Sequence, residues 1–161
     1  MFRVGIGFDA HRFSEGRKLI LGGVEIPFEL GLKGHSDADV LSHAICDAIL
    51  GAIGEGDIGA HFPDSDPKYK GMSSLLFISE AVSLARKMNY LVANIDSVVI
   101  CQKPRLTKHI PDIKNSLSGL DGLTHSSVSV KATTTDEMGF TGRSEGIAAK
   151  AVVLLKENKR Y

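Results

Sequence analysis

The chain lacks several features that mark particular classes of protein. Its 161 residues include no tryptophan and only two cysteines, and its 19 Lys and Arg balance 19 Asp and Glu, so the formal net charge is zero. Two cysteines provide no disulfide framework, and we expect Cys46 and Cys101 to be small buried side chains. A neutral chain is not held to nucleic acid by bulk charge, so we expect no nucleic-acid partner.

Long apolar runs and targeting segments are also missing. No run is long enough to cross a bilayer, and the first residues, MFRVGIGFDAH, have no signal-peptide or transit-peptide pattern. We therefore expect a cytoplasmic location and no membrane partner. No repeat or low-complexity linker interrupts the chain, and its length suits one domain with a sizeable core. Residues 1–161 are thus predicted to form a single domain.

Hydrophobic periodicity predicts a mixed set of strands and helices. The strands are expected at 2–8, 18–21, 24–27, 95–101 and 127–133, and the helices at 37–53, 73–87, 107–117 and 145–158. The intervening loop 54–71 is long for a compact domain, and loops of such length are usually functional or disordered. This order of elements indicates an α+β or α/β domain. We favour α+β, with one mixed β-sheet covered by helices on one side.

The expected helix at 37–53 carries a stripe of titratable residues, Asp39, His43 and Asp47. These residues share one face because i and i+4 are neighbours on a helix surface. The opposite face is an apolar core stripe made of Leu41, Ala44, Ile45, Ala48, Ile49 and Ala52. We expect Ser36 and Asp37 to cap the helix, which places His35 and Ser36 beside N–H groups that favour an anion. The alternative interpretation is an ordinary solvated face.

A second cluster of functional residue types follows the first strand. Asp9 and His11 point to the same side if the strand continues, because side chains two residues apart share a face. Together with His43 they supply two imidazoles and one carboxylate, the ligands of an open zinc site that can polarise a phosphoryl or carbonyl oxygen. Asp47 is expected to orient His43. Spacing alone leaves a chance arrangement of unrelated side chains as the alternative.

A third cluster lies between Lys131 and Glu145, in the stretch KATTTDEMGFTGRSE. Thr133, Thr134 and Thr135 offer hydroxyl and N–H groups, Arg143 can hold an anion, and Asp136 can hold a second hard cation such as magnesium. The alternative is a strand end followed by an ordinary turn. The chain has no P-loop, and Gly5 to Gly7 do not form a dinucleotide-binding fingerprint.

Five long stretches together resemble the 2-C-methyl-D-erythritol 2,4-cyclodiphosphate synthase family. They are GFDAH at 7–11, GHSDADVLSHAICDAIL at 34–50, GDIGAHFPDSDP at 56–67, CQKPRLTKHIP at 101–111 and KATTTDEMGFTGRSEGIA at 131–148. The resemblance implies a single catalytic domain that acts in the non-mevalonate isoprenoid pathway. The implied reaction converts 4-diphosphocytidyl-2-C-methyl-D-erythritol 2-phosphate into the cyclic diphosphate and releases CMP. The resemblance also implies a homotrimer with active sites between adjacent subunits.

The resemblance assigns roles to individual residues. Asp9, His11 and His43 become zinc ligands, with Asp9 and His11 close to the substrate, and Asp136 becomes a ligand of a second divalent cation, Mg²⁺ or Mn²⁺. His35 and Thr134 stabilise the transferring phosphoryl group, and Ser36 lies by the phosphates. The methylerythritol part contacts Asp57, Ile58, Gly59, Phe62, Pro63, Asp64, Ser65 and Asp66. The cytidine part contacts Cys101, Gln102, Lys103, Pro104, Arg105, Leu106, Thr107, Thr133, Thr134 and Thr135. Phe140 and Arg143 complete the family motif near the trimer centre.

Two positions depart from the family pattern, which has Glu where this chain has Asp136 and Gly where it has Ser144. Asp is one methylene shorter, and Ser does not adopt a positive φ without strain. Two further functions use the same residues: a zinc-dependent phosphohydrolase, in which water attacks and a linear product forms, and a non-catalytic trimer that binds cytidine nucleotides. No role is predicted for His61, His109 or His125.

Overall fold

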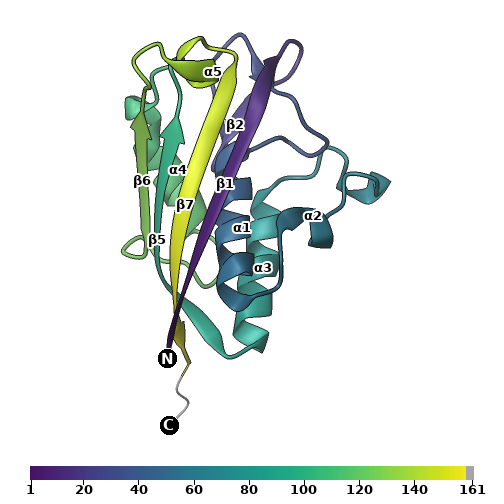
Figure 1. Ribbon diagram of the computed structural model, residues 1–161, viewed down its shortest axis with the longest axis vertical. Coiled ribbons are helices and arrows are strands. Elements are labelled where there is room, and N and C mark those ends of the chain that lie inside the picture. The colour runs from purple at the N-terminus through teal and green to yellow at the C-terminus, as the bar shows by residue number, and fades with distance from the viewer. Residues whose placement is uncertain (159–161) are drawn as a thin grey trace.

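A long antiparallel pair of strands, β1 (Phe2–Ser14) and β7 (Gly146–Glu157), runs the length of the molecule in the computed structural model (Figure 1). The sheet order is β4-β1-β7-β5-β6, with β4 at Gly31–Leu32, β5 at Tyr90–Ile100 and β6 at Val128–Thr133. The β5–β6 pair is parallel and the other pairs are antiparallel, so the sheet is mixed, as predicted. The structure describes residues 1–158, and residues 159–161 of the predicted domain lie outside the described part.

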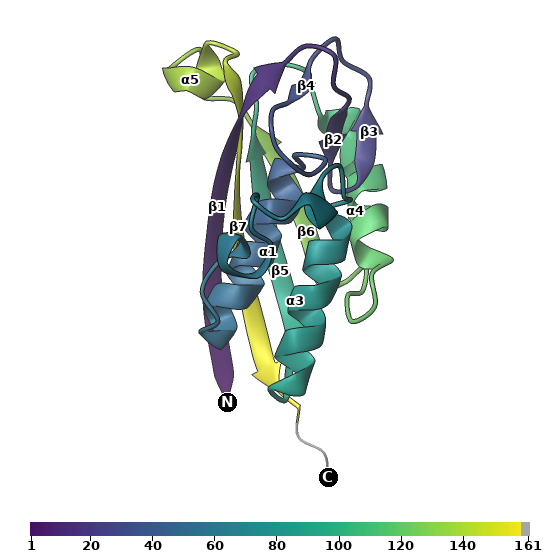
Figure 2. The same ribbon diagram turned by 90° about the vertical axis from the view of Figure 1, so that its right-hand side faces the viewer.

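Helices cover one face of this sheet. Figure 2 shows α1 (Val40–Ile53), α3 (Leu75–Lys87) and α4 (Ile110–Ser118) on the same side of the strands. A separate hairpin joins β2 (Leu19–Leu21) to β3 (Val24–Ile26). Short helical turns lie within the loops: α2 (Ile58–His61), η1 (Pro67–Tyr69), η2 (Thr107–His109) and α5 (Gly139–Gly142). The predicted α+β class and the one-sided helical layer are therefore confirmed.

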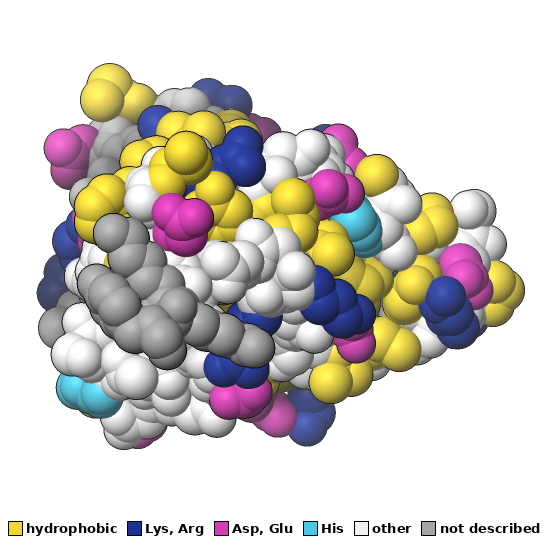
Figure 3. Space-filling view, turned by 90° about the horizontal axis from the view of Figure 1, so that it is seen from below, with side chains coloured by type: hydrophobic (Ala, Val, Ile, Leu, Met, Phe, Trp, Pro, Cys, Tyr) yellow, Lys and Arg dark blue, Asp and Glu magenta, His cyan; other side chains and the backbone are white. Residues whose placement is uncertain are grey.

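Three further observations concern the charged surface, the cysteines and the helix lengths. Acidic and basic side chains are interspersed on the face seen from below, without a large patch of either sign (Figure 3). Both cysteines are free and buried, as expected, and burial raises the pKa of the Cys101 thiol to about 12. Within residues 1–158, the structure contains no helix with the length and apolar character needed to span a bilayer.

Helix α1 packs directly on the backbone of β1. A Cβ added to Gly5 would lie 1.9 Å from the carbonyl oxygen of Ala48, and a Cβ added to Gly7 would lie 1.9 Å from that of Ala44. Only glycine permits this approach, so the glycines of the alternating strand face the helix. The apolar residues at the alternate positions of the strand point to the opposite side and are more than half exposed: Phe2, Val4, Ile6 and Phe8.

The prediction of a helix at 145–158 is wrong, because this segment forms strand β7 at the centre of the sheet. Its alanines and leucines favour a helix intrinsically, but pairing with both β1 and β5 overrides that preference. The side chains of Ala149, Ala151 and Val153 alternate toward the helices and are buried, whereas Lys150 and Val152 point away. The alanines are small, which lets α1 approach the sheet closely.

The expected start of the helix at 37–53 also needs correction. Helix α1 begins at Val40 and is capped by Asp39, rather than by Ser36 or Asp37. The Asp39 side chain is fully buried and accepts hydrogen bonds from the backbone N–H groups of Ser42, Gly22 and Gly23 at 3.1, 2.9 and 2.8 Å. Asp39 therefore does not share an open stripe with His43 and Asp47. It ties the β2–β3 turn to the start of α1.

Replacing Gly7 with Ala should lower the free energy of unfolding by about 3 kcal/mol or more, because the new methyl group overlaps the α1 backbone. Gly119→Ala is the matched control, since its Cβ would meet neighbouring atoms at ordinary contact distances of 3.4 and 3.5 Å. Urea denaturation of both variants measures the difference. Equal stability of the two variants would show that the α1–β1 approach is not constrained as described.

Candidate active site

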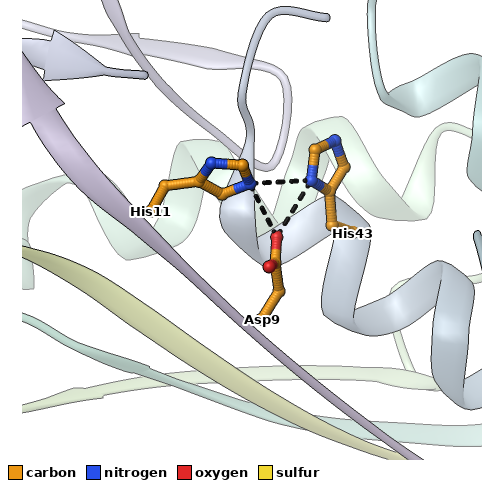
Figure 4. A group of neighbouring side chains, drawn as sticks. All are labelled: Asp9, His11 and His43. Atoms are coloured by element: carbon orange, nitrogen blue, oxygen red, sulfur yellow. Dashed lines mark hydrogen bonds and ion pairs between the residues drawn. The ribbon is translucent and has the colours of Figure 1, made fainter. Parts of the chain in front are cut away.

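Asp9 and His11 of β1 meet His43 of α1 at one point (Figure 4). The Asp9 Oδ2 atom lies 2.8 Å from His11 Nε2 and 2.9 Å from His43 Nδ1, and the two nitrogens are 3.1 Å apart. Strand β1 continues to Ser14, so Asp9 and His11 share a face as predicted. All three residues are partly buried, with the cluster still open to a cavity.

The cluster has strongly coupled charges. Burial alone would raise the pKa of Asp9, but the hydrogen bonds and charges of His11 and His43 hold that pKa well below its usual range. For His11, burial lowers the pKa, and the hydrogen bond and charge of Asp9 outweigh this effect and raise it. Asp9 is therefore a carboxylate at neutral pH, as a metal ligand must be.

The outer nitrogens of both imidazoles have polar partners. The Nδ1 atom of His11 lies 2.6 Å from the carbonyl oxygen of Lys33. A carbonyl oxygen only accepts, so Nδ1 carries a proton, and the neutral form of His11 that binds a cation would present its Nε2 lone pair to the cluster. Two imidazoles and a carboxylate with converging ligand atoms fit a divalent cation, and three protein ligands leave a coordination position free.

The prediction that Asp47 orients His43 is wrong. The Asp47 carboxylate instead accepts a hydrogen bond from the Ile58 N–H group at 2.7 Å, and burial raises its pKa. The Nε2 atom of His43 lies 2.9 Å from the Ser74 hydroxyl and 3.2 Å from the Ser36 hydroxyl. Asp47 thus holds the loop that follows α1, and hydroxyl groups contact the histidine.

A cavity of about 340 Å³ opens beside this cluster, with Asp9, His11 and His43 in its wall. Of the other predicted site residues, His35, Ser36, Ile58, Gly59, Phe62, Pro63 and Asp64 also line it. The Nδ1 atom of His35 is buried and has no hydrogen-bond partner among the described residues. This unpaired nitrogen is a polar group that a ligand in the cavity can satisfy.

Three loop residues of the prediction do not line this cavity. Asp57 caps α2 through the Ala60 N–H group at 3.0 Å, and Asp66 caps η1 through the Lys68 N–H group at 3.0 Å. Ser65 lies between Asp64 and Asp66 but is not part of the cavity wall. The two carboxylates shape the loop by satisfying its backbone donors.

An aromatic cluster closes one side of the cavity, and of its three members only Phe62 was predicted as a site residue. Phe62 stacks on Phe77 with ring centroids 4.4 Å apart, and Tyr69 meets both rings edge-on at 5.5 and 5.9 Å. Tyr69 lies in a loop without periodicity, so no pattern indicated where its side chain points. Phe77 is a buried α3 residue, and its buried position alone gave no sign of a cavity.

A second cavity, of about 480 Å³, lies at the ends of β5 and β6. Its walls contain every predicted cytidine-contact residue except Thr135: Cys101, Gln102, Lys103, Pro104, Arg105, Leu106, Thr107, Thr133 and Thr134, together with Ala132. Thr135 instead donates to the Met138 carbonyl oxygen at 2.6 Å. The Asp136 carboxylate accepts from the Thr134 hydroxyl at 3.2 Å, beside this cavity. None of these wall residues belongs to the wall of the first cavity.

The remaining residues of the third cluster lie by a smaller cavity of about 220 Å³, lined in part by Phe140, His11 and Glu145. Arg143 is outside this wall and donates to Glu145 Oε1 at 2.7 Å. Ser144 has a φ of 56°, which lies in the left-handed region. Serine adopts this conformation only with strain, unlike the glycine that the family pattern has here.

The fold and the cluster define a single-domain α+β protein in which three residues able to hold a divalent metal lie beside a cavity. A family model described as the YgbB family matches residues 2–156, and the chain belongs to this family. The resemblance noted in the sequence is thereby confirmed.

Relatives and solved structures agree with this assignment. A protein of Syntrophobacter fumaroxidans named 2-C-methyl-D-erythritol 2,4-cyclodiphosphate synthase is 55% identical over 158 residues, 98% of this chain and 99% of the relative. The bifunctional IspDF of Campylobacter jejuni superposes with a TM-score of 0.93 at 42% identity, covering 98% of this chain, which spans only 42% of that longer protein. A CDP complex of IspF from Plasmodium falciparum has a TM-score of 0.85 at 34% identity and covers 98% and 97% of the two chains.

Ser144→Gly should raise the free energy of unfolding by about 1 kcal/mol, because glycine adopts the observed positive φ without strain. The control Ser83→Gly lies inside α3 and should lower it by about 0.5 kcal/mol, since glycine is a poor helix former. Thermal unfolding of both variants shows whether each substitution raises or lowers the stability. A lower melting temperature for Ser144→Gly would contradict the strain at this position.

Proposed function

We propose that the chain converts 4-diphosphocytidyl-2-C-methyl-D-erythritol 2-phosphate into 2-C-methyl-D-erythritol 2,4-cyclodiphosphate with release of CMP, in the non-mevalonate route to isoprenoids. Membership of the YgbB family and the shared name of its relatives support this activity, that of a phosphorus–oxygen lyase. The observation that carries the proposal is the convergence of Asp9, His11 and His43 on one point in the wall of a cavity.

We assign zinc to the cluster of Asp9, His11 and His43, because two imidazoles with one carboxylate and a free position match the ligand preference of catalytic zinc. Zinc bound there would act as a Lewis acid that stabilises negative charge on phosphoryl oxygens. We assign a second divalent cation, Mg²⁺ or Mn²⁺, to Asp136, whose carboxylate lies beside the Thr134 hydroxyl.

The reaction needs no nucleophile from the protein. An oxygen of the 2-phosphate forms a bond to the β-phosphorus, the bond from that phosphorus to the bridging oxygen breaks, and its electron pair leaves with CMP. The protein therefore contributes positioning and charge stabilisation. His35, with its unpaired Nδ1, and Ser36 contact the phosphates, and the Thr134 hydroxyl faces the transferring group.

The cavity beside the cluster and the cavity at the ends of β5 and β6 divide the substrate between them. We propose that Ile58, Gly59 and Phe62, with the rest of the first wall, contact the methylerythritol part, and that residues 101–107 hold cytidine largely through backbone groups. The CDP complexes of similar structures support a nucleotide site in this fold. We keep Asp57, Ser65 and Asp66 as substrate-loop residues that shape the first cavity from outside its wall.

We propose a homotrimer in which the first cavity of one subunit faces the second cavity of its neighbour. The walls share no residue, although one substrate must occupy both. The exposed apolar row of Phe2, Val4, Ile6 and Phe8 on β1 offers a surface that association would bury. In this assembly each chain is one catalytic domain. We place it in the cytoplasm, consistent with two unpaired thiols.

A phosphorus NMR time course with the cytidine diphosphate substrate, magnesium and zinc-loaded protein tests the activity. Two mutually coupled signals of a cyclic diphosphate should rise together with CMP. His43→Ala should lose zinc and nearly all turnover, since it removes one of three ligands, whereas His61→Ala should retain both because His61 lies outside the cluster and its Nε2 atom bonds the Glu55 carbonyl oxygen.

Other products would identify another function. A linear phosphate with CMP would indicate a zinc phosphohydrolase, and nucleotide binding without turnover would indicate a binding module. A folded His43→Ala protein with the wild-type rate would contradict the proposed mechanism.

Ile6→Glu should convert the trimer into monomers, because it places a charge in the apolar row of β1 where association would bury it. Leu76→Glu is the matched control, since Leu76 is comparably exposed on α3, away from this sheet face. Sedimentation equilibrium measures the mass of each variant. A trimeric Ile6→Glu protein would show that the row is not the interface.

A further inference from the structure

Ser74 occupies the position before α3 where serine usually caps a helix, but its hydroxyl makes no capping hydrogen bond. The side chain is fully buried and its hydroxyl contacts other partners. It lies 2.9 Å from His43 Nε2 and donates a short hydrogen bond to the Asp37 carboxylate. Ser74 thus connects the Asp37 carboxylate to His43, the candidate metal ligand, instead of capping α3.

The direction of these hydrogen bonds follows from the chemistry of the groups. An ionised carboxylate only accepts, so the Ser74 hydroxyl must donate its proton to Asp37. The lone pairs of the Ser74 oxygen then accept the Nε2–H of His43. This arrangement favours the proton of neutral His43 at Nε2, which leaves at Nδ1 the lone pair that a cation between His43, Asp9 and His11 would bind.

We propose that Asp37 and Ser74 are positioning residues that set the tautomer of His43 and strengthen its binding of the metal. The inference rests on the proposed metal site and adds a carboxylate–hydroxyl–imidazole relay behind it. The Nδ1–H of His11 likewise donates to the Lys33 carbonyl oxygen. Each imidazole therefore has an acceptor at the ring nitrogen that points away from the cluster. Such outer partners orient a ligand and raise its basicity.

The relay can be separated from the folding role of the same residues. The Asp37 carboxylate also accepts the backbone N–H of Ser74 at 3.0 Å, and this bond remains when the hydroxyl is removed. Ser36 also contacts His43 Nε2, at 3.2 Å, but its oxygen accepts the Ala38 N–H, and it reaches the Asp37 carboxylate only through the Ser74 hydroxyl at 3.4 Å. Ser36 is therefore a weaker substitute for Ser74.

The test is the dissociation constant of zinc, measured by competition with a chelator for wild type, Ser74→Ala, Asp37→Asn and the double variant. Ser74→Ala should weaken zinc binding by about 10- to 100-fold. Asp37→Asn should also weaken it, because a neutral amide oxygen is a weaker acceptor than a carboxylate oxygen and holds the proton of the Ser74 hydroxyl less strongly. The double variant should be no weaker than the weaker single variant, since the two residues act in series.

Ser79→Ala is the matched control, because this serine lies in α3, which Ser74 precedes, and among residues 1–158 its hydroxyl hydrogen-bonds the Leu75 carbonyl oxygen alone, at 3.1 Å. It should bind zinc as wild type does. Melting temperatures of the metal-free proteins establish that each variant is folded. If Asp37→Asn unfolds, the comparison of Ser74→Ala with Ser79→Ala decides the question.

The outcomes separate the relay from the proposed function. Wild-type affinity in a folded Ser74→Ala protein, or independent additive losses in the double variant, would overturn the relay. If His43→Ala still abolished zinc binding in that case, the metal site and the proposed function would stand. Failure of the wild type to bind zinc would overturn both.

Discussion

The backbone contact between α1 and β1 is the constraint on which the candidate active site depends. Gly7 lies against the carbonyl group of Ala44, and no side chain fits between them. His43 adjoins Ala44 in the helix, and Asp9 follows Gly7 by two residues on the strand, so the packing contact places the ligand atoms within hydrogen-bonding distance. The same contact turns the larger apolar side chains of β1 to the opposite face, where a partner can cover them.

Two carboxylates at the start of α1 then fix the surroundings of the cluster. Asp39 binds the Gly22–Gly23 turn, and Asp37 binds the first residue before α3. A buried carboxylate is costly unless donors surround it, and here backbone N–H groups of other elements supply them. Satisfying these charges holds the β2–β3 hairpin and α3 against the end of α1 that carries His43.

Much of this arrangement could be predicted from the sequence, because some signals are local. The spacing of Asp9 and His11 and the helical core stripe of α1 each depend on one element, and the structure brings Asp9, His11 and His43 together as predicted. The error at β7 arose because alanines favour a helix locally, whereas the central place of this strand is set by distant partners. Ser74 and Tyr69 were missed for the same reason: their roles depend on contacts across the fold.

Anomalous diffraction at the zinc edge from crystals grown with zinc and CDP tests the central claim most directly. The account predicts an anomalous peak within coordination distance of Asp9 Oδ2, His11 Nε2 and His43 Nδ1 of one subunit. It also predicts cytosine in the cavity of residues 101–107 of the adjacent subunit. Zinc at another site, or cytosine and zinc held by one subunit alone, would contradict it.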